Sequence, residues 1–292
     1  MGYIMNPSKF EIFLKVEETK NFTRTAEYYQ YTQSAISQTI KSLENEMGVT
    51  LFHRTTTGLL LTDEGKYLLP AILEITRGHQ NLEERLSDLK NNHTGRIRLG
   101  GYISMSCHWL PVCVKEFKKL YPNVTFEMYQ EDDAQLLDWL KKGTIDMAFI
   151  CNPKKREFAY QELFEDPFLV ILPPDYPVSP KKIYSLRDFK NEYFIFLEVG
   201  YVEYLNQMFK EAGYKPVVKY RTIDDFTTLS MVEQGFGISI LPKLATYRSP
   251  FPVQTVYPEE ACSRYPGIVT RKNDHYSWAQ KKFMQFAKNF TI

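Results

Sequence analysis

Apolar and polar positions in the stretch from Phe22 to Lys41 recur with helical spacing, and two short helices account for the pattern. The first helix spans Thr23–Tyr29. Thr32 ends the polar turn that follows and is a suitable N-cap for a second helix that begins at Gln33. This second helix carries one apolar stripe, formed by Ile36, Ile40, Leu43 and Met47. The spacing predicts a helix-turn-helix pair with one buried face.

The opposite face of the second helix holds uncharged hydrogen-bonding groups and one cation: Gln33, Ser34, Ser37, Gln38 and Lys41. A helix that reads base edges needs such a face, because its N-terminal side chains enter the major groove while the partner helix crosses the backbone. We therefore expect these side chains to contact DNA, together with Thr23 and Thr32. The helix pair alone is equally compatible with a small helical hairpin whose polar face is only solvated.

A helix precedes this pair and two short strands follow it. Asn6 can cap a helix whose first position is Pro7. After the second helix of the pair, Gly48 is the expected C-terminal stop. Leu51–Phe52 and Leu59–Leu61 then have the pattern of two strands around a turn that contains threonines and a glycine. These elements predict a wing attached to the helix-turn-helix unit.

A long helix is predicted from the cap residue Thr62 to about Lys90. Seven of its residues alternate in spacings of four and three: Leu68, Ile72, Ile75, His79, Leu82, Leu86 and Leu89. This is the heptad spacing of a coiled-coil seam, so we expect these residues to mediate dimerisation. The alternative is an amphipathic helix that packs on its own domain.

From Arg96 onward strand patterns alternate with helix patterns, which predicts parallel sheets covered on both faces. The first series has strands at 96–100, 124–128 and 146–150, and helices at 109–120 and 132–142. The second series has strands at 168–172, 193–197 and 217–221, and helices near 202–212 and 225–233. The chain then passes through a strand near 235–242 and a return segment at 267–270 to a terminal helix at 277–289. We expect two lobes joined by two crossing segments.

Composition and charge limit the class of protein. The chain has 292 residues, of which 43% are hydrophobic and 24% charged, and this suits two or three compact units. No apolar run is long enough to cross a bilayer and no signal sequence begins the chain, so we expect a cytoplasmic protein without a membrane partner. The four cysteines lack C-x-x-C spacing, and neither a disulfide framework, a metal site nor a cofactor is expected. Charge gives DNA binding no support, because residues 1–60 carry six Lys/Arg and six Asp/Glu.

Longer motifs resemble a known family. The stretches NFTRTAEYYQYTQSAISQTI, LENEMGVTLFHR and LLLTDEG closely resemble the N-terminal domain of the LysR-type transcriptional regulators. The stretches LPVCVKEFKKLYPNVTFEM, LLDWLKKGTIDMAFI and VEQGFGISILP resemble the effector domain of that family, so the resemblance covers nearly the whole chain. It implies a mixed fold with a winged helix-turn-helix domain over 5–62, a linker or dimerisation helix over 63–92, and an α/β two-lobe effector domain over 93–292. The effector domain would resemble periplasmic binding proteins.

The resemblance also implies a finer arrangement. Lobe I would comprise about 95–164 and 269–292, and lobe II about 165–268. The wing would lie beside the DNA backbone or minor groove, which places Arg54 on a phosphate or in that groove. The linker helices would pair antiparallel in a homodimer or homotetramer, so that His79 meets His79 of the partner subunit. Double-stranded DNA and a small-molecule effector are the other partners that the family implies.

Ligands of open α/β sheets bind beyond the C-terminal ends of strands, and here two lobes supply such ends to one site. In lobe I, Tyr102, Ser104 and Ser106 follow the first strand close to a helix N-terminus, which suits a carboxylate. In lobe II, the corresponding positions are Glu198, Tyr201, Thr222 and Asp224. The acidic groups would suit an effector that carries an amine as well as an acid. The alternative for the serines and for Asp224 is simple helix capping.

Two other functions are alternatives: a solute-binding module, and a substrate-binding lobe of an enzyme with an unrelated helical N-terminus. A solute-binding module for transport would need an export signal, which the chain lacks. Cys107 and His108 are adjacent and so make a poor nucleophile–base pair. No Gly-rich phosphate loop, G-x-S-x-G elbow or H-E-x-x-H motif is present. We therefore interpret the chain as an effector-responsive transcription factor and not as an enzyme.

Overall fold

A computed structural model describes residues 7–56, 58–89, 94–178, 183–272 and 276–292, apart from the side chains of residues 80, 81, 84, 85, 87 and 88. The chain divides into two compact units, Met1–Lys90 and Asn91–Ile292. The long helix that was predicted as a separate linker therefore lies within the first unit. Among the described residues, no helix is long and apolar enough to cross a bilayer.

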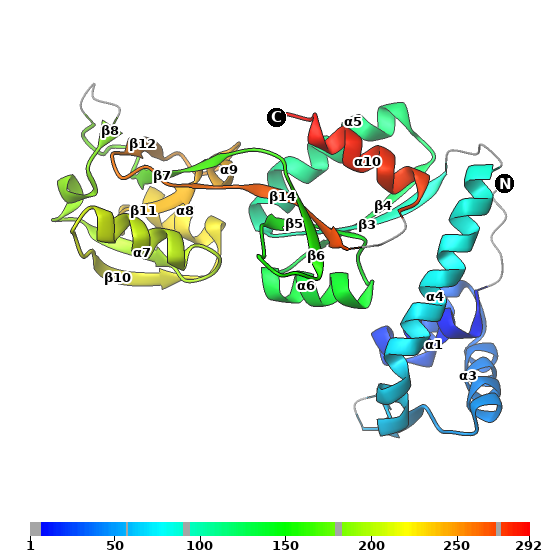
Figure 1. Ribbon diagram of the computed structural model, residues 1–292. Coiled ribbons are helices and arrows are strands. Elements are labelled where there is room, and N and C mark those ends of the chain that lie inside the picture. Colours follow the sequence, from blue (N-terminus) through cyan, green and yellow to red (C-terminus); the bar gives the residue numbers. More distant parts are fainter. Residues whose placement is uncertain (1–6, 57, 90–93, 179–182, 273–275) are drawn as a thin grey trace. The chain divides into compact units, whose positions relative to one another are not determined.

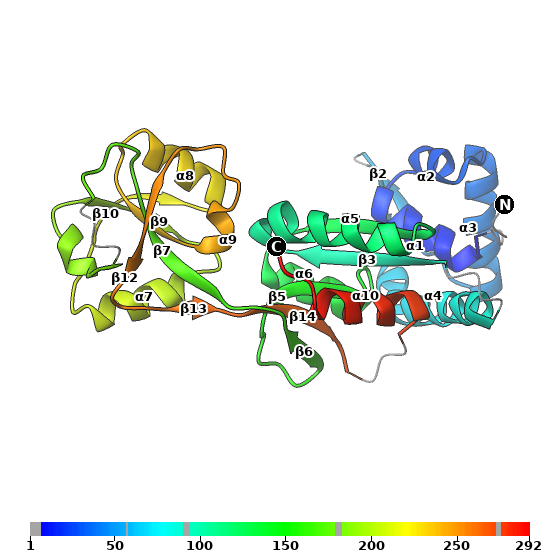
Figure 2. The ribbon, with the colours of Figure 1, turned by 90° about the horizontal axis from the view of Figure 1, so that it is seen from above.

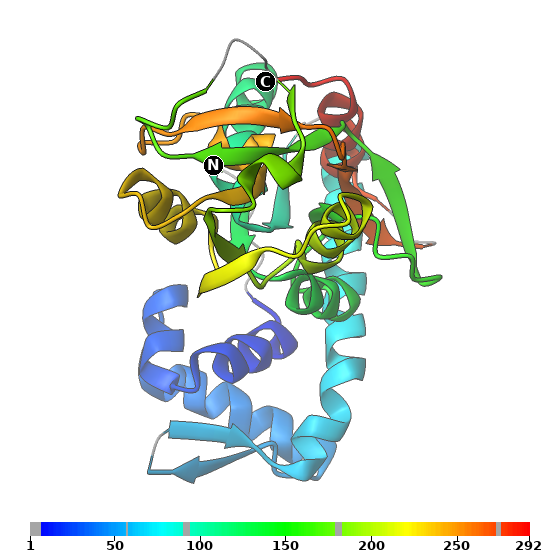
Figure 3. The ribbon, with the colours of Figure 1, turned by 90° about the vertical axis from the view of Figure 1, so that its left-hand side faces the viewer.

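The first unit is a winged helix-turn-helix followed by a long helix (Figures 1 and 3). Its elements in chain order are α1 (Lys9–Thr19), α2 (Phe22–Tyr29), α3 (Gln33–Met47), β1 (Phe52–Thr55), β2 (Gly58–Leu61) and α4 (Asp63–Leu89). The strands β1 and β2 pair antiparallel and form the predicted wing. Thr32 caps α3, Gly48 ends it in a left-handed conformation, and Thr62 accepts a hydrogen bond from the Gly65 amide at the start of α4.

The start of the first helix differs from the prediction. Ser8 is the N-cap, and α1 begins at Lys9, because Ser8 and Glu11 form a reciprocal capping box. Pro7 lies before the helix, and Asn6 lies outside the described residues. The capping box satisfies two amide groups at once, and this outweighs the preference of proline for a first helical position.

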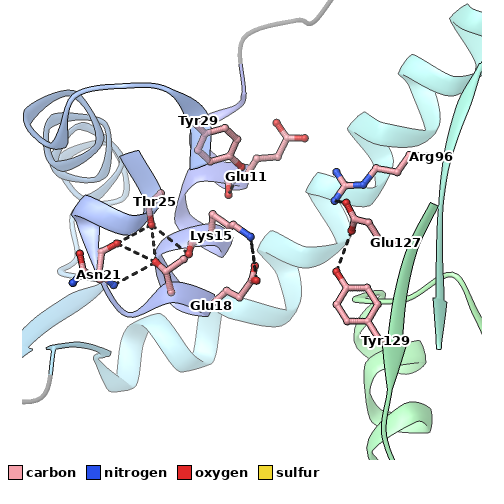
Figure 4. A network of polar contacts seen from close by, with 10 residues as sticks. Glu11, Lys15, Glu18, Asn21, Thr25, Tyr29, Arg96, Glu127 and Tyr129 are labelled. Carbon is pink, nitrogen blue, oxygen red and sulfur yellow. Dashed lines mark hydrogen bonds and ion pairs between the residues drawn. The ribbon is translucent and has the colours of Figure 1, made fainter. Parts of the chain in front are cut away.

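The core of the first unit joins all four helices and the wing. Phe13, Val16 and Ile36 have almost no exposed surface, and Leu51 and Leu61 of the wing region pack with them. Thr25 is also fully buried, and its hydroxyl bonds the Asn21 carbonyl oxygen at 2.9 Å and the Thr19 hydroxyl at 2.7 Å (Figure 4). Thr25 therefore fixes the crossing of α1 and α2 without leaving an unpaired polar group.

The first turns of α4 belong to this core, which corrects part of the predicted dimerisation seam. Ile72 is only 1% exposed and Leu68 packs beside it, so both residues contact their own unit. The seam residues Ile75, Leu82, Leu86 and Leu89 are exposed by 50%, 56%, 42% and 82%. The seven-residue spacing runs through the buried first turns and the exposed later turns of α4, because both sets of residues lie on the same face of the helix.

Lobe I of the second unit is a five-stranded sheet with the order β4-β3-β5-β14-β6. Its strands are β3 (Gly95–Gly101), β4 (Val124–Gln130), β5 (Met147–Cys151), β6 (Phe158–Glu162) and β14 (Pro266–Arg271). Its helices are α5 (Leu110–Leu120), which extends a π-helical turn at Met105–Trp109, α6 (Asp133–Lys142) and α10 (Trp278–Lys288). The strands β3, β4 and β5 are parallel as predicted, but β14 runs antiparallel to β5 and β6. The predicted parallel pairing of this three-strand series is therefore confirmed, and the return segment adds an antiparallel strand.

Lobe II departs from the predicted parallel sheet, because β7 lies in another sheet than β9 and β10. Its elements are β7 (Asp166–Leu172), β8 (Ile183–Tyr184), β9 (Tyr193–Leu197), α7 (Val202–Glu211), β10 (Val217–Thr222), α8 (Asp225–Glu233), β11 (Ser239–Pro242), α9 (Lys243–Thr246), β12 (Gln254–Pro258) and β13 (Ser263–Arg264), together with a 3₁₀ helix at Leu186–Phe189. β9 and β10 are parallel, whereas β11, β12 and β13 all pair antiparallel with β7. Buried strands of both kinds have similar apolar runs, so the pattern alone did not distinguish them.

Two segments connect the lobes and lie side by side (Figures 1 and 2). One enters lobe II at β7, and the other returns to lobe I through β13 and β14. In the β7–β13 pair, Arg264 lies directly opposite Asp166. The lobes also touch next to this pair, because Leu244 of α9 packs into the core of lobe I, and Tyr247 lies edge-on to the ring of His108. The crossing segments therefore bring one charged pair to the junction of both lobes.

Candidate DNA-binding face and effector site

The N-terminal half of α3 presents a polar face to solvent. Gln33, Ser34, Gln38 and Lys41 are exposed, and Ser37 is half-buried. The buried positions Ile36, Ile40 and Leu43 hold the opposite side of the helix in the core. Thr32 is exposed as well, but its hydroxyl accepts the Ala35 amide at 3.2 Å, so it shapes the helix start. The side chains that were predicted to contact DNA therefore share one exposed face, apart from the half-buried Ser37.

Some positively charged side chains of the first unit form ion pairs, and others do not. Lys9, Lys15 and Lys20 form ion pairs with Glu46, Glu18 and Glu17, and Figure 4 shows the second pair. Glu44 accepts the Leu51 amide at 2.7 Å and so fixes the segment before the wing. Arg24, Lys41 and Arg54 are exposed, and none of them forms an ion pair within the part of the chain that the structure describes. The balanced total charge thus conceals three cations that remain available to phosphates.

The wing and the start of α2 carry two of these cations. Arg54 lies on β1, paired across the wing with Leu59, and its side chain is exposed. Arg24 lies in the first turn of α2, where the Asn21 side chain accepts the amides of Thr23 and Arg24 at 2.7 and 3.2 Å. Thr23, a predicted DNA contact, is exposed, and so is Arg24, which was not predicted. The sequence pattern does not distinguish Arg24 from other surface arginines. Only the structure shows that it forms no ion pair among the described residues.

In the second unit, Arg264 is the centre of a buried polar cluster. Its guanidinium Nε donates to Asp166 Oδ2 at 2.8 Å, and Nη2 lies 2.7 Å from the same oxygen. Nη2 also donates to Ser104 Oγ of lobe I at 2.8 Å, and Nη1 donates to Tyr201 Oη of lobe II at 3.0 Å. Arg264 is 1% and Asp166 2% exposed. Arg264, on a crossing segment, therefore forms hydrogen bonds with both lobes.

Two aromatic rings and a helix terminus complete this cluster. The guanidinium lies 4.6 Å from the ring centroid of Tyr102 and 5.1 Å from that of Tyr201. Burial by itself would lower the pKa of Arg264, but Tyr102, Tyr201 and Asp166 raise it well above its usual range, so the side chain stays charged. The other Asp166 oxygen, Oδ1, accepts the Leu244 amide at the start of α9 at 2.8 Å. Asp166 is thereby held from two sides.

The seven residues predicted for the effector site divide into two groups. Tyr102, Ser104 and Tyr201 meet at Arg264, and Ser104 makes no capping hydrogen bond, so its hydroxyl is committed to the arginine. The other four have local partners in the structure. Ser106 donates to the Gly101 carbonyl, Glu198 pairs with Arg221, Thr222 bonds Thr228, and Asp224 caps α8 through the Thr227 amide. For Asp224 the structure therefore supports the capping alternative.

Two carboxylates near Arg264, Asp225 and Asp133, are not among the predicted site residues. Asp225, the first residue of α8, is 2% exposed, and its Oδ2 accepts the Tyr201 hydroxyl at 3.4 Å. Burial raises its pKa to about 6, although Arg264 and the Tyr201 hydrogen bond oppose the shift. Asp133, the first residue of α6, is accessible to solvent, yet the surrounding protein raises its pKa to about 6 as well. Their common signal was a second aspartate directly after a capping aspartate in each lobe.

Family models match both units. Residues 7–66 match the bacterial regulatory helix-turn-helix protein, lysR family, and residues 90–291 match the LysR substrate binding domain. Among relatives, the uncharacterized HTH-type transcriptional regulator YvbU of Bacillus subtilis is 28% identical over 287 residues, which is 97% of this chain and 98% of YvbU.

Solved structures show the same fold. A full-length OxyR variant from Pseudomonas aeruginosa superposes with a TM-score of 0.70 at 21% identity, over 96% of this chain and 95% of that chain. The effector binding domain of QuiR in complex with shikimate gives 0.60 at 24% identity, over 66% of this chain and 95% of that chain. The winged helix-turn-helix, the two-lobe domain and both family models agree, and the chain belongs to the LysR-type transcriptional regulators, sequence-specific DNA-binding proteins whose activity a small-molecule effector modulates.

Proposed function

We propose that α3 is the recognition helix and enters the major groove with its first two turns. The observation that carries this proposal is the single exposed face formed by Gln33, Ser34, Gln38 and Lys41, with Ser37 at its edge. Amide and hydroxyl groups at these positions can exchange hydrogen bonds with base edges. Arg54 on the wing and Arg24 on α2 flank this reading helix with charges that suit phosphates.

A second proposal concerns assembly. The exposed apolar residues of α4, namely Ile75, Leu82, Leu86 and Leu89, pack against a second copy of the chain in a homodimer or homotetramer. His79 interrupts this face, is half-buried, and its Nδ1 has no hydrogen-bond partner among the described residues. Two copies would bring two recognition helices to a pseudo-palindromic site.

The effector acts at the junction of the lobes. Arg264 contacts Ser104 of lobe I and Tyr201 of lobe II, so a ligand that binds beside this cluster changes contacts of both lobes at once. Such a ligand favours one arrangement of the lobes over another, and the assembly transmits this preference to the DNA-binding units as a population shift. Because a regulator of this kind acts on DNA, we infer that the protein acts in the cytoplasm.

The thiol environments support a regulator without enzymatic activity. The pKa of Cys107 is raised by burial and by the charge of Asp225, and burial likewise raises the pKa of Cys113, Cys151 and Cys262. A catalytic cysteine requires the opposite shift, because the thiolate is the nucleophile. Burial also lowers the pKa of His108, whose ring packs against Phe226 and Tyr247.

The DNA proposal is tested by binding of variants to the specific site and to random DNA over a range of salt concentrations. Gln38→Ala should lose about 1–3 kcal/mol on the specific site and relax its preference at one base pair. Arg54→Ala should weaken binding to specific and random DNA alike. It should also reduce the dependence of binding affinity on salt concentration by about one counterion. Lys15→Ala is the matched control, because Lys15 is already paired with Glu18.

Two results would contradict these roles. If Gln38→Ala lost equal affinity for specific and random DNA, Gln38 would contact the DNA backbone and not the bases. A salt slope that Arg54→Ala leaves unchanged, or that Lys15→Ala reduces equally, would remove Arg54 from the interface.

A further inference from the structure

The buried charges around Arg264 do not balance. Arg264 carries one positive charge and Asp166 opposite it carries one negative charge, so this pair is neutral. Asp225 adds a second buried carboxylate, and its Oδ1 has no hydrogen-bond partner among the described residues. A buried carboxylate oxygen without a partner is costly, and native structures seldom keep one without a functional reason.

The guanidinium has little capacity left for a negatively charged ligand. Its Nε, Nη1 and Nη2 atoms already donate to Asp166, Tyr201 and Ser104. An anion that took Arg264 would leave Asp166 buried next to Asp225 with no counter-charge. Removing one partner of a buried ion pair leaves the other charge uncompensated, so this exchange is unfavourable.

A cation meets the opposite conditions. Asp225 Oδ1 is free to accept a hydrogen bond, and the positive charge would offset the surplus carboxylate. Asp133 adds a second carboxylate from lobe I, and no ion pair reaches either aspartate within the described residues. The charge of Asp225 also raises the pKa of the exposed Cys107 thiol.

We propose that the effector carries a protonated amine, and that Asp225 binds this group at the junction of the two lobes. Asp225 is the specificity-determining residue, and the aromatic ring and hydroxyl of Tyr201 line the same position. The buried Tyr102 hydroxyl, which has no partner among the described residues, is available to a second polar group of the same ligand. This inference rests on the proposed function, in which the junction of the lobes is the effector site.

The test uses the full-length protein and four small compounds: butylamine, γ-aminobutyrate, butyrate and shikimate. Calorimetric titration should show binding of butylamine and γ-aminobutyrate in preference to butyrate and shikimate. Asp225→Asn should lower the binding affinity for both amines by about 10- to 100-fold, which is the effect of one lost charge-assisted hydrogen bond. Asp224→Asn is the matched control, because it removes the same charge from the neighbouring residue and asparagine still caps α8.

Amine affinity should also fall in wild type as Asp225 becomes protonated below about pH 6, and this fall should be smaller in Asp225→Asn, in which only Asp133 still titrates in this range. Binding of butyrate or shikimate alone, equal amine affinity in wild type and Asp225→Asn, or no binding of any compound would overturn the inference. Titration of the same preparations with DNA separates this failure from a failure of the proposed function, because DNA binding through α3 does not depend on Asp225.

Discussion

Asp225 shows how much the position of a single carboxylate decides. Asp224 and Asp225 are neighbours at the start of α8, yet Asp224 caps the helix and is half-exposed, whereas Asp225 points into the protein. The N-terminal dipole of α8 favours a negative charge, but desolvation is the larger effect and the pKa rises to about 6. The same residue type, one position apart, is structural in one case and a candidate binding group in the other.

This shift predicts a pH dependence of stability. Because the folded-state pKa of Asp225 exceeds its ordinary value of 3.8, the protonated form stabilises the fold at low pH, and this stabilisation is lost as the pH rises through about 6. Asp225→Asn should therefore stabilise the second unit by about 1–3 kcal/mol near pH 7 and by little near pH 4. Urea unfolding followed by tryptophan fluorescence measures this, since Trp109, Trp139 and Trp278 all lie in that unit.

Asp133 also titrates near pH 6 but remains in both proteins, so the difference between them isolates Asp225. Asp224→Asn should show no comparable gain in stability. A stability difference that does not change between the two pH values would refute the assignment of the shift to Asp225.

At the scale of elements, α4 combines two packing roles along one face. Its first turns place Ile72 in the core of the first unit, and its later turns leave Leu82 and Leu86 exposed. Exposed leucines at heptad spacing are the pattern of a coiled-coil seam, whereas the buried ones belong to an amphipathic helix. Both sequence interpretations of this helix therefore describe a part of it.

The exposed part predicts how the dimer responds to substitution. Leu82→Lys should raise the dimer dissociation constant by about 10- to 100-fold, because it places a charge in an apolar seam. Tyr67→Lys is the matched control on the same helix, since Tyr67 is 86% exposed and lies outside the seam. Sedimentation equilibrium of the full-length protein measures both. Equal dissociation constants for Leu82→Lys and Tyr67→Lys would exclude Leu82 from the interface.

At the scale of the effector-binding unit, Arg264 connects elements far apart in the sequence. Its hydrogen bonds reach Ser104, 160 residues earlier, and Asp166, 98 residues earlier. Hydrophobic cores on either side hold the lobes, but this cluster is the polar contact that both lobes share with a crossing segment. Its integrity should therefore govern the stability of the junction between the lobes.

A double-mutant cycle tests this role. Arg264→Met should destabilise the second unit by about 3–5 kcal/mol, because it leaves the Asp166 charge buried and unpaired. Adding Asp166→Asn should recover about 1–3 kcal/mol of this loss, since the amide keeps an acceptor for the Leu244 amide and removes the charge. Tryptophan-detected urea unfolding of the four proteins gives the coupling energy. Strictly additive effects would show that the pair does not act as a unit.

Local patterns determined much of the first unit. Apolar spacing located α2, α3 and the wing, and the capping preferences of Thr32, Gly48 and Thr62 set the helix ends, because these depend on neighbouring residues alone. The polar face of α3 followed from the same spacing. The sequence also placed α6, α7 and α8 within a residue of their observed bounds.

Long-range contacts decided the rest. The direction of β14 and of the strands around β7 depends on pairing between distant segments, which an apolar run does not encode. The partition of the cations into paired and unpaired groups required side-chain positions, as did the burial of Ile72 in its own unit. The Arg264 cluster formed because two crossing segments place Arg264 opposite Asp166, a register set by the packing of whole lobes. Buried charges acquire their roles from their neighbours in space, and those neighbours are fixed only when the chain has folded.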